Sequence, residues 1–301
     1  MTPALYYPYK SEALRDSCFG YLDERAEREW PVPSETRTVP TSFGPTFVRI
    51  SGPAGAPPLM LLPGASAPSL MWVPNVGPLS IACRTYAVDV VSDFGRSLCT
   101  RAVQCFADLI PWMHELLDGL GLGEGINLAG VSYGGALAAE YALQHPERTG
   151  KVILLAPGNT VLRVRAEFML RLVWAAFSPS KRMPEMIRWI FADAQRKDPQ
   201  WVTAAADQLL LNMRSMQRRK VPHPRVWSDA EWARLQPPTL FLVGEHEVIY
   251  PAQKAVDRLR RVAPAVTAEI VPGAGHDLTF SQADLVNRRM LEFLQPAAVA
   301  V

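Results

Sequence analysis

The 301-residue sequence predicts an α/β fold: a mostly parallel eight-stranded sheet with helices on both faces and one helical insertion. Three observations predict it. Short, continuous apolar runs recur along the chain, as in strands that are buried on both faces. Helical patterns separate several of these runs, which is typical of βαβ units. One long stretch between two runs shows helical periodicity only. The expected strands cover residues 37–41, 46–50, 59–62, 85–91, 126–129, 151–156, 239–243 and 268–271.

The chain is expected to begin with a helical extension over residues 1–35. Residues 10–29 are charged and favour a helix with a partial apolar face, which can pack on the main body. Pro31 and Pro33 follow directly and end this helix. The first two expected strands then form an antiparallel hairpin, with Gly44-Pro45 as the turn between them.

Helical patterns between the later strands cover residues 100–120, 134–144 and 252–262. Pro111 lies inside the first of them. Because a proline in a helix interior removes a backbone hydrogen bond, we expect it to kink or divide that helix.

The insertion runs from residue 159 to residue 235, where no strand pattern occurs. It is rich in Arg, Met and aromatic residues and is too amphipathic for a disordered linker. Its helical periodicity is clearest at 162–177, 184–195 and 201–216. The expected organisation is therefore an extension (1–35), an α/β core (36–157 and 236–301) and a helical cap (158–235).

Composition excludes several classes of protein. A formal net charge of +2 argues against a nucleic-acid-binding protein, and the basic run Arg218-Arg219-Lys220 is interpreted as a solvated loop. The four cysteines show neither zinc-site nor disulfide spacing and are expected to be reduced. No signal peptide and no apolar run of about 18 residues is visible. We expect a cytoplasmic protein without a membrane span.

The most informative motif is Gly130-Val131-Ser132-Tyr133-Gly134-Gly135, which lies between a strand pattern and an Ala-rich helix pattern. Such a corner strains the backbone at Ser132 by about 1–3 kcal/mol. Gly130 and Gly134 permit it, because a Cβ at either position would collide with neighbouring backbone. The serine hydroxyl then sits at a helix N-terminus, where amide groups favour negative charge. This is the pattern of a nucleophile elbow.

A serine nucleophile needs a base, and the base needs an orienting carboxylate. Of the five histidines, His276 is favoured, because it follows the last strand in a Gly-rich loop at the carboxyl edge of the sheet. His145 is interpreted as a helix cap and His114 as a surface or packing residue. His223 lies in the insertion, where it could touch substrate. His246 is interpreted as a solvent-facing loop residue.

The carboxylate is expected in the loop after residues 239–243, where Glu245 and Glu247 compete. Glu247 is favoured because it lies three residues after the glycine that ends the strand and can turn back toward the sheet edge. Glu245 follows that glycine directly and should point outward.

An oxyanion also needs N–H donors. The amide of Tyr133 is one candidate. The amide of Ala65 is the other, because Gly64 permits a sharp turn after the strand at 59–62. Ser66 could add a hydroxyl or stabilise the turn.

These residues resemble the α/β-hydrolase fold superfamily, and most closely its serine carboxylesterase-like branch. The resemblance covers about residues 36–295, with 158–235 matching the cap that the family inserts before its acid-bearing strand. It rests on four motifs in the family's order, Leu62-Pro63-Gly64-Ala65, the elbow at 130–135, Gly244-Glu245-His246-Glu247 and Gly275-His276, and on Val88-Asp89 with Phe94-Gly95-Arg96-Ser97.

Two positions depart from the family's usual pattern. Pro63 replaces a histidine in the oxyanion loop, so that loop must be held differently. Glu247 replaces the usual aspartate and is one methylene longer. Because position 132 is serine, the branches that use a carboxylate nucleophile, haloalkane dehalogenases and epoxide hydrolases, are disfavoured.

The resemblance implies a serine hydrolase that cleaves carboxylic esters or thioesters through an acyl-enzyme on Ser132, with no metal and no organic cofactor. The aromatic and Met-rich cap favours a small-molecule substrate with an apolar acyl or alcohol group. The same triad could instead serve C–C bond hydrolysis, perhydrolysis or a biosynthetic cyclase or lyase step. A non-catalytic ligand receptor is the third hypothesis. Substrate identity and oligomeric state stay open.

Overall fold

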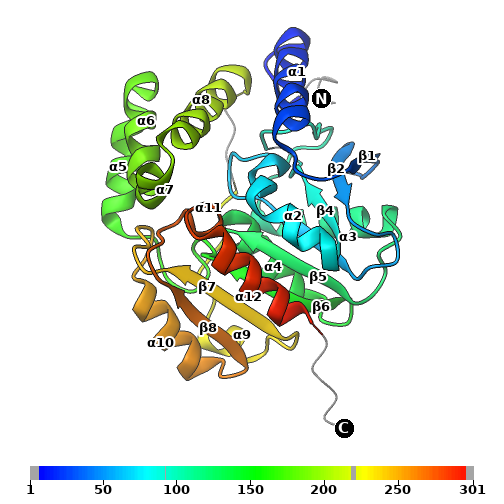
Figure 1. Ribbon diagram of the computed structural model, residues 1–301, viewed down its shortest axis with the longest axis vertical. Helices are drawn as coiled ribbons and strands as arrows, with labels where there is room; N and C mark the ends of the chain where they lie inside the picture. Colours follow the sequence, from blue (N-terminus) through cyan, green and yellow to red (C-terminus); the bar gives the residue numbers. More distant parts are fainter. Residues whose placement is uncertain (1–6, 92, 218–221, 296–301) are drawn as a thin grey trace.

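The computed structural model describes residues 7–91, 93–217 and 222–295, which leaves the basic run at 218–220 outside the described residues. The sheet has eight strands in the order β1-β2-β4-β3-β5-β6-β7-β8. From β3 to β8 all neighbours are parallel, whereas β2 pairs antiparallel with both β1 and β4. This confirms the expected mostly parallel sheet, and Figure 1 shows helices in front of and behind it.

All eight expected strands are present, most with bounds within two or three residues of the apolar runs. The strands are β1 Ser34–Val39, β2 Thr46–Ser51, β3 Pro58–Leu62, β4 Arg84–Val88, β5 Ile126–Val131, β6 Thr149–Leu155, β7 Thr239–Gly244 and β8 Val266–Val271. The strand expected over 85–91 ends at Val88. The next residue, Asp89, uses its carboxylate to accept hydrogen bonds from the amides of Ser69 and Arg96, so the chain turns away from the sheet there.

Four helical predictions, 10–29, 134–144, 201–216 and 252–262, match the structure within two residues, and several further helices were not suggested by the sequence. The helices are α1 Glu12–Glu29, η1 Ser69–Trp72, α2 Val73–Ala82, η2 Phe106–Asp108, α3 Leu109–Gly119, α4 Tyr133–Gln144, α5 Ala166–Ala176, α6 Pro179–Ile190, α7 Ala192–Lys197, α8 Pro199–Ser215, α9 Asp229–Ala233, α10 Ala252–Val262, α11 Leu278–Ser281 and α12 Ala283–Leu294.

The prediction of one kinked helix over 100–120 is wrong in its first half. The helix begins only at Leu109, after the short turn η2. Pro111 is then the third residue of α3. The first four N–H groups of a helix have no partner within it, so a proline there removes no helical hydrogen bond and causes no break.

Two apolar layers cover the two faces of the sheet. Successive strand residues point to opposite faces. Met60 and Leu62 accordingly pack with helices α3, α4 and α10, whereas Leu59 and Leu61 pack with α2 and α12. In the sheet, β3 has β4 as its neighbour on one side and β5 as its neighbour on the other. The loops after β3 and β5 are therefore neighbours at the carboxyl edge, where ligands bind in open α/β sheets.

The insertion leaves the sheet after β6. Its helices α5 to α8 gather at the upper left of Figure 1, next to α11 at the carboxyl edge. Its last part returns to the body, since Trp227 and Trp232 are buried in the main apolar cluster and Arg258 of α10 pairs with Asp229 of α9. No helix among the described residues is long and apolar enough to cross a lipid bilayer.

Helix α1 joins the insertion to the body. Arg25 donates to Gln208 of α8, and the ammonium group of Lys10 donates to the carbonyls of Met213 and Arg214. The buried side of α1 belongs to an apolar cluster that also holds residues after β3, after β4 and at the end of α8. Its buried members are Tyr9, Cys18, Leu22, Ala26, Leu70, Phe94 and Met216.

Candidate active site

Ser132 occupies the corner between β5 and α4 with φ 51° and ψ −111°, a strained backbone conformation for a residue with a side chain. The flanking glycines make room for it. A Cβ at Gly130 would lie 2.2 Å from the carbonyl oxygen of Gly134, and a Cβ at Gly134 would lie 2.3 Å from that of Leu62. The geometry is that of a nucleophile elbow, and the side chain of Ser132 is partly exposed.

The loop after β3 lies directly beside this serine. A Cβ built on Gly64 would be 3.7 Å from the Cβ of Ser132. The next residue, Ala65, is exposed, and nothing in the described part of the chain accepts a hydrogen bond from its amide. Tyr133, the first residue of α4, is nearly buried and packs its ring edge-on against Phe106. Both sequence-predicted amide donors thus belong to segments next to Ser132.

The loop after β3 is held by groups that the sequence reasoning missed. Asp93 accepts a hydrogen bond from the amide of Ser66 at 3.0 Å, and Asp89 accepts one from the amide of Ser69 at 2.6 Å. The amide of Gly64 points to the thioether sulfur of Met71 at 3.0 Å. These contacts position a loop in which Pro63 cannot donate a backbone hydrogen bond.

His276 and Glu247 form a buried pair at the same edge of the sheet. His276 Nδ1 lies 2.8 Å from Glu247 Oε2, and the two residues are 8% and 3% exposed. The other carboxylate oxygen, Oε1, accepts the amide of Ile249 at 2.8 Å. Burial by itself lowers the pKa of His276. The charge and hydrogen bond of Glu247 and the charge of Asp277 outweigh it and raise that pKa above its ordinary value.

The loops after β7 and β8 touch each other, which brings this pair together. A Cβ at Gly244 would lie 2.2 Å from the carbonyl oxygen of Gly275, and the amide of His246 donates to the carbonyl of Ala274 at 2.8 Å. Within the described residues no hydrogen bond joins Ser132 to His276. Nucleophile–base hydrogen bonds are often long in free enzymes and tighten when substrate binds.

The competing acid, Glu245, is not beside the histidine ring. Its side chain is 56% exposed and accepts the amide of Gly273 at 3.0 Å. This follows from the strand: Glu245 immediately succeeds the last strand residue and points outward, whereas Glu247 turns back.

The other four histidines, like His276, form no hydrogen bond with Ser132 among the described residues, and none of them forms one with Glu247. His145 is the C-cap residue of α4, and His114 contacts Tyr141 and Arg148. His223 is exposed. His246 is about half exposed, but it also faces a carboxylate, because its Nδ1 lies 3.1 Å from Asp193 of α7.

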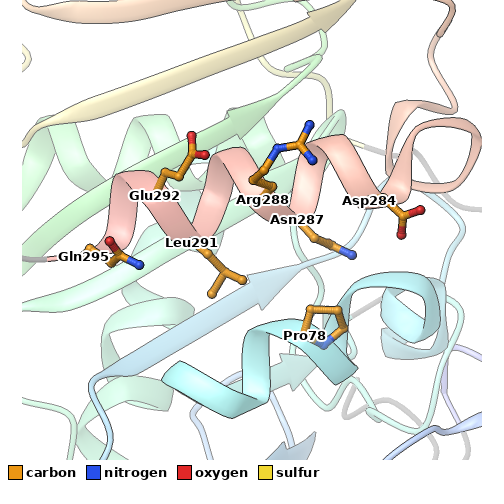
Figure 2. A pocket seen from close by; sticks show the side chains of 7 residues that line it. All are labelled: Pro78, Asp284, Asn287, Arg288, Leu291, Glu292 and Gln295. Atoms are coloured by element: carbon orange, nitrogen blue, oxygen red, sulfur yellow. The ribbon is translucent and has the colours of Figure 1, made fainter.

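The described residues contain no metal-binding cluster, and a pocket that they do form has none of the predicted site residues in its lining. Among the described residues, no group of three or more His, Cys, Asp or Glu side chains could hold a metal ion. Figure 2 shows a pocket between α2 and α12, lined by Pro78 and by α12 side chains together with Gln295. None of the sequence-predicted site residues belongs to it.

The chain is similar to several known hydrolases. A family model described as the alpha/beta hydrolase family matches residues 59–289. Carboxylesterase YbfK of Bacillus subtilis (strain 168) is 35% identical over 88% of this chain and 89% of its own length. An uncharacterised carboxylesterase, nap, from the same strain is 33% identical over 88% of each chain.

Solved structures agree with these sequence matches. The crystal structure of naproxen esterase from Bacillus subtilis superimposes with a TM-score of 0.86 and 30% identity, covering 95% of this chain and 100% of that one. The crystal structure of carboxylesterase CesB (YbfK) from the same species gives a TM-score of 0.83 and 33% identity over 92% and 97%.

Proposed function

Because the chain belongs to the alpha/beta hydrolase family, we propose that it cleaves its substrates with a triad of Ser132, His276 and Glu247. The similar carboxylesterases indicate which kind of bond is cleaved. Two carboxylesterases are 33–35% identical to this chain over most of its length. The protein is a carboxylic ester hydrolase.

In the proposed mechanism, Ser132 Oγ attacks the ester carbonyl and His276 Nε2 takes its proton. The tetrahedral intermediate collapses when His276 returns that proton to the leaving alcohol. The resulting acyl-enzyme is then hydrolysed by water, with His276 again acting as base. The observation that carries this proposal is the buried 2.8 Å contact between His276 Nδ1 and Glu247, which keeps the proton on Nδ1 and leaves Nε2 free to accept one.

Charge on the intermediate requires donors that are already in place. We assign this role to the amides of Tyr133 and Ala65, which lie on the two segments next to Ser132. Asp89 and Asp93 accept hydrogen bonds from the amides of Ser69 and Ser66 and so fix the conformation of the loop that carries Ala65. This donor therefore does not need to reorganise during the reaction.

The insertion serves as a cap in this proposal, and its surface favours apolar substrates. Helix α5 begins beside the loop after β7 that carries Glu247, since the amide of Arg165 donates to the carbonyl of Ile249 at 2.7 Å. Large apolar side chains then stay exposed along it, including Leu170 at 71%, Trp174 at 61% and Phe177 at 77%. An apolar acyl or alcohol group on an ester or thioester is the chemistry that such a surface accommodates.

A fluorophosphonate probe tests the triad. The wild-type protein should be labelled at one site, and peptide mapping should identify Ser132. Ser132→Ala should lose the label and about 10⁴–10⁶-fold of kcat toward p-nitrophenyl esters, because the nucleophile is gone. The matched control is Ser66→Ala, which removes a serine from the neighbouring loop. This variant should still be labelled at Ser132. Labelling elsewhere, or turnover by Ser132→Ala, would remove this serine from the mechanism.

Activity assays with other substrates separate ester hydrolysis from C–C bond hydrolysis and perhydrolysis. Candidate diketones and peracid formation should be screened beside the esters, and ester turnover should exceed both. We also propose a cytoplasmic location, which is supported by the fact that none of the four cysteines, all of which lie among the described residues, forms a disulfide.

A further inference from the structure

Asp277, the residue after His276, has a buried carboxylate with three hydrogen-bond donors. It is 2% exposed. Oδ1 accepts the amide of Gly275 at 3.1 Å and the hydroxyl of Ser281 at 3.0 Å. These two donors lie on either side of His276 in the sequence, one in the loop after β8 and one in α11. The carboxylate therefore closes the loop that presents the histidine.

The other carboxylate oxygen of Asp277 contacts the insertion. Oδ2 accepts the amide of Ala194 in α7 at 2.6 Å, across 83 residues of sequence. Ala194 is the third residue of α7, and the amides at a helix start have no partner within the helix. This contact joins the insertion directly to the residue that follows His276.

Further contacts surround this junction. Lys197, the last residue of α7, donates to the carbonyls of Phe280 and Ser281 in α11. Trp201 of α8 stacks on Phe280 with ring centroids 3.9 Å apart. Helices α7 and α11 thus form one packed unit, and the buried carboxylate of Asp277 accepts hydrogen bonds from both of them.

We propose that Asp277 is a positioning residue that ties the His276 loop to helix α7, so that the base is correctly placed only while the insertion is seated. The inference rests on the proposed role of His276 as the base. Asp277 does not touch the reacting atoms. It acts through the backbone of the loop on one side and through the insertion on the other.

The charges around this residue give the proposal a readout beyond stability. The negative charge of Asp277 adds to that of Glu247 in raising the pKa of His276, although burial opposes both. From α7, Asp193 faces the same region, and its partners are Arg196 of the same helix and His246 in the loop after β7. Removing the charge at position 277 should therefore lower the pKa of the base.

The experiment compares Asp277→Asn, Asp277→Ala and a matched control, Asp284→Asn, which changes an exposed aspartate on α12. For Asp277→Ala we expect kcat to fall about 10²-fold, as for a reacting group displaced by about 1 Å. For Asp277→Asn we expect the midpoint of the kcat/KM pH profile to move to lower pH. In both, the amides of α7 should exchange with deuterium faster. The control should match the wild type in kcat, in the midpoint of the kcat/KM pH profile and in the deuterium exchange of the α7 amides.

The readouts keep this inference separate from the triad. If wild-type Ser132 is not labelled by the fluorophosphonate, the proposed function fails, whatever the Asp277 variants do. If the wild type is labelled and Asp277→Asn is folded, an unchanged pH midpoint together with unchanged α7 exchange would overturn the role of Asp277. Should Asp277→Ala fail to fold, the isosteric Asn variant decides alone.

Discussion

Replacing Glu247 with glutamine removes the negative charge beside His276 and leaves the shape of the side chain unchanged. The amide oxygen can still accept the hydrogen bond from Ile249, so the loop should keep its conformation. What is lost is the attraction between the carboxylate and the imidazolium that forms as Ser132 attacks. The variant therefore isolates an electrostatic contribution to the transition state.

The size of this contribution follows from the contact. With Nδ1 and Oε2 2.8 Å apart, the two charge centres lie about 4 Å from each other. Two unit charges at that distance attract by about 4 kcal/mol at an effective dielectric constant of 20. This corresponds to about 10³-fold in kcat. The glutamine NH₂ can also favour the wrong imidazole tautomer, which adds to the loss.

The matched control is Glu245→Gln, the same chemical change two residues earlier. Its carboxylate is more than half exposed, so water screens the charge and kcat should change less than about threefold. Hydrolysis of p-nitrophenyl butyrate as a function of pH measures both variants. Glu247→Gln should also move the midpoint of the profile to lower pH, since the charge that raises the pKa of His276 is gone. A larger loss of kcat in Glu245→Gln than in Glu247→Gln would refute the assignment of the acid.

Four further predictions concern pH and the elbow. Wild-type kcat/KM should rise with pH and reach half its maximum above pH 6.5, the ordinary pKa of histidine, because His276 is raised above that value; a midpoint below it contradicts the pair. The same shift stabilises the fold at pH values below 6.5, and chemical denaturation should show this contribution disappearing as pH rises through the raised pKa. Ser132→Gly should abolish turnover yet raise the free energy of unfolding by about 1 kcal/mol, since glycine tolerates φ 51°; a less stable variant would speak against backbone strain. Gly130→Ala should cost more than about 3 kcal/mol in thermal unfolding, whereas Gly55→Ala, where no atom lies within 4 Å of the new Cβ, should cost almost nothing; equal effects would exclude the close approach as the cause.

The sequence predicted the sheet well because its strands are buried on both faces. Such strands must be apolar throughout, and this property is visible without any knowledge of the partners. Helix α2 was missed for the opposite reason. Its sequence contains Pro74, Gly77 and Pro78, which disfavour a helix, and packing of Trp72, Val76 and Leu79 in the core overrides that local preference.

The residues named for the site were those that carry a local signal. Ser132 lies between glycines, and His276 and Glu247 follow apolar runs. Asp93 and Asp277 carry no such signal, because the distant partners that give them their supporting role, Ser66 and Ala194, lie 27 and 83 residues away. A short polar side chain after a strand has many possible partners, and only the folded arrangement selects one. The sequence could therefore indicate the groups proposed to react but not the groups that support them.

Helix α1 packs against both the insertion and the body of the molecule. Through Leu22 and Ala26 it shares one apolar cluster with Leu70, which follows the proposed oxyanion loop, and with Met216 at the end of α8. A chain shortened to begin at Trp30 would uncover one side of α8 and loosen the support of that loop at the same time. We expect such a truncation to alter substrate access and catalysis together, although none of the proposed triad residues lies on α1.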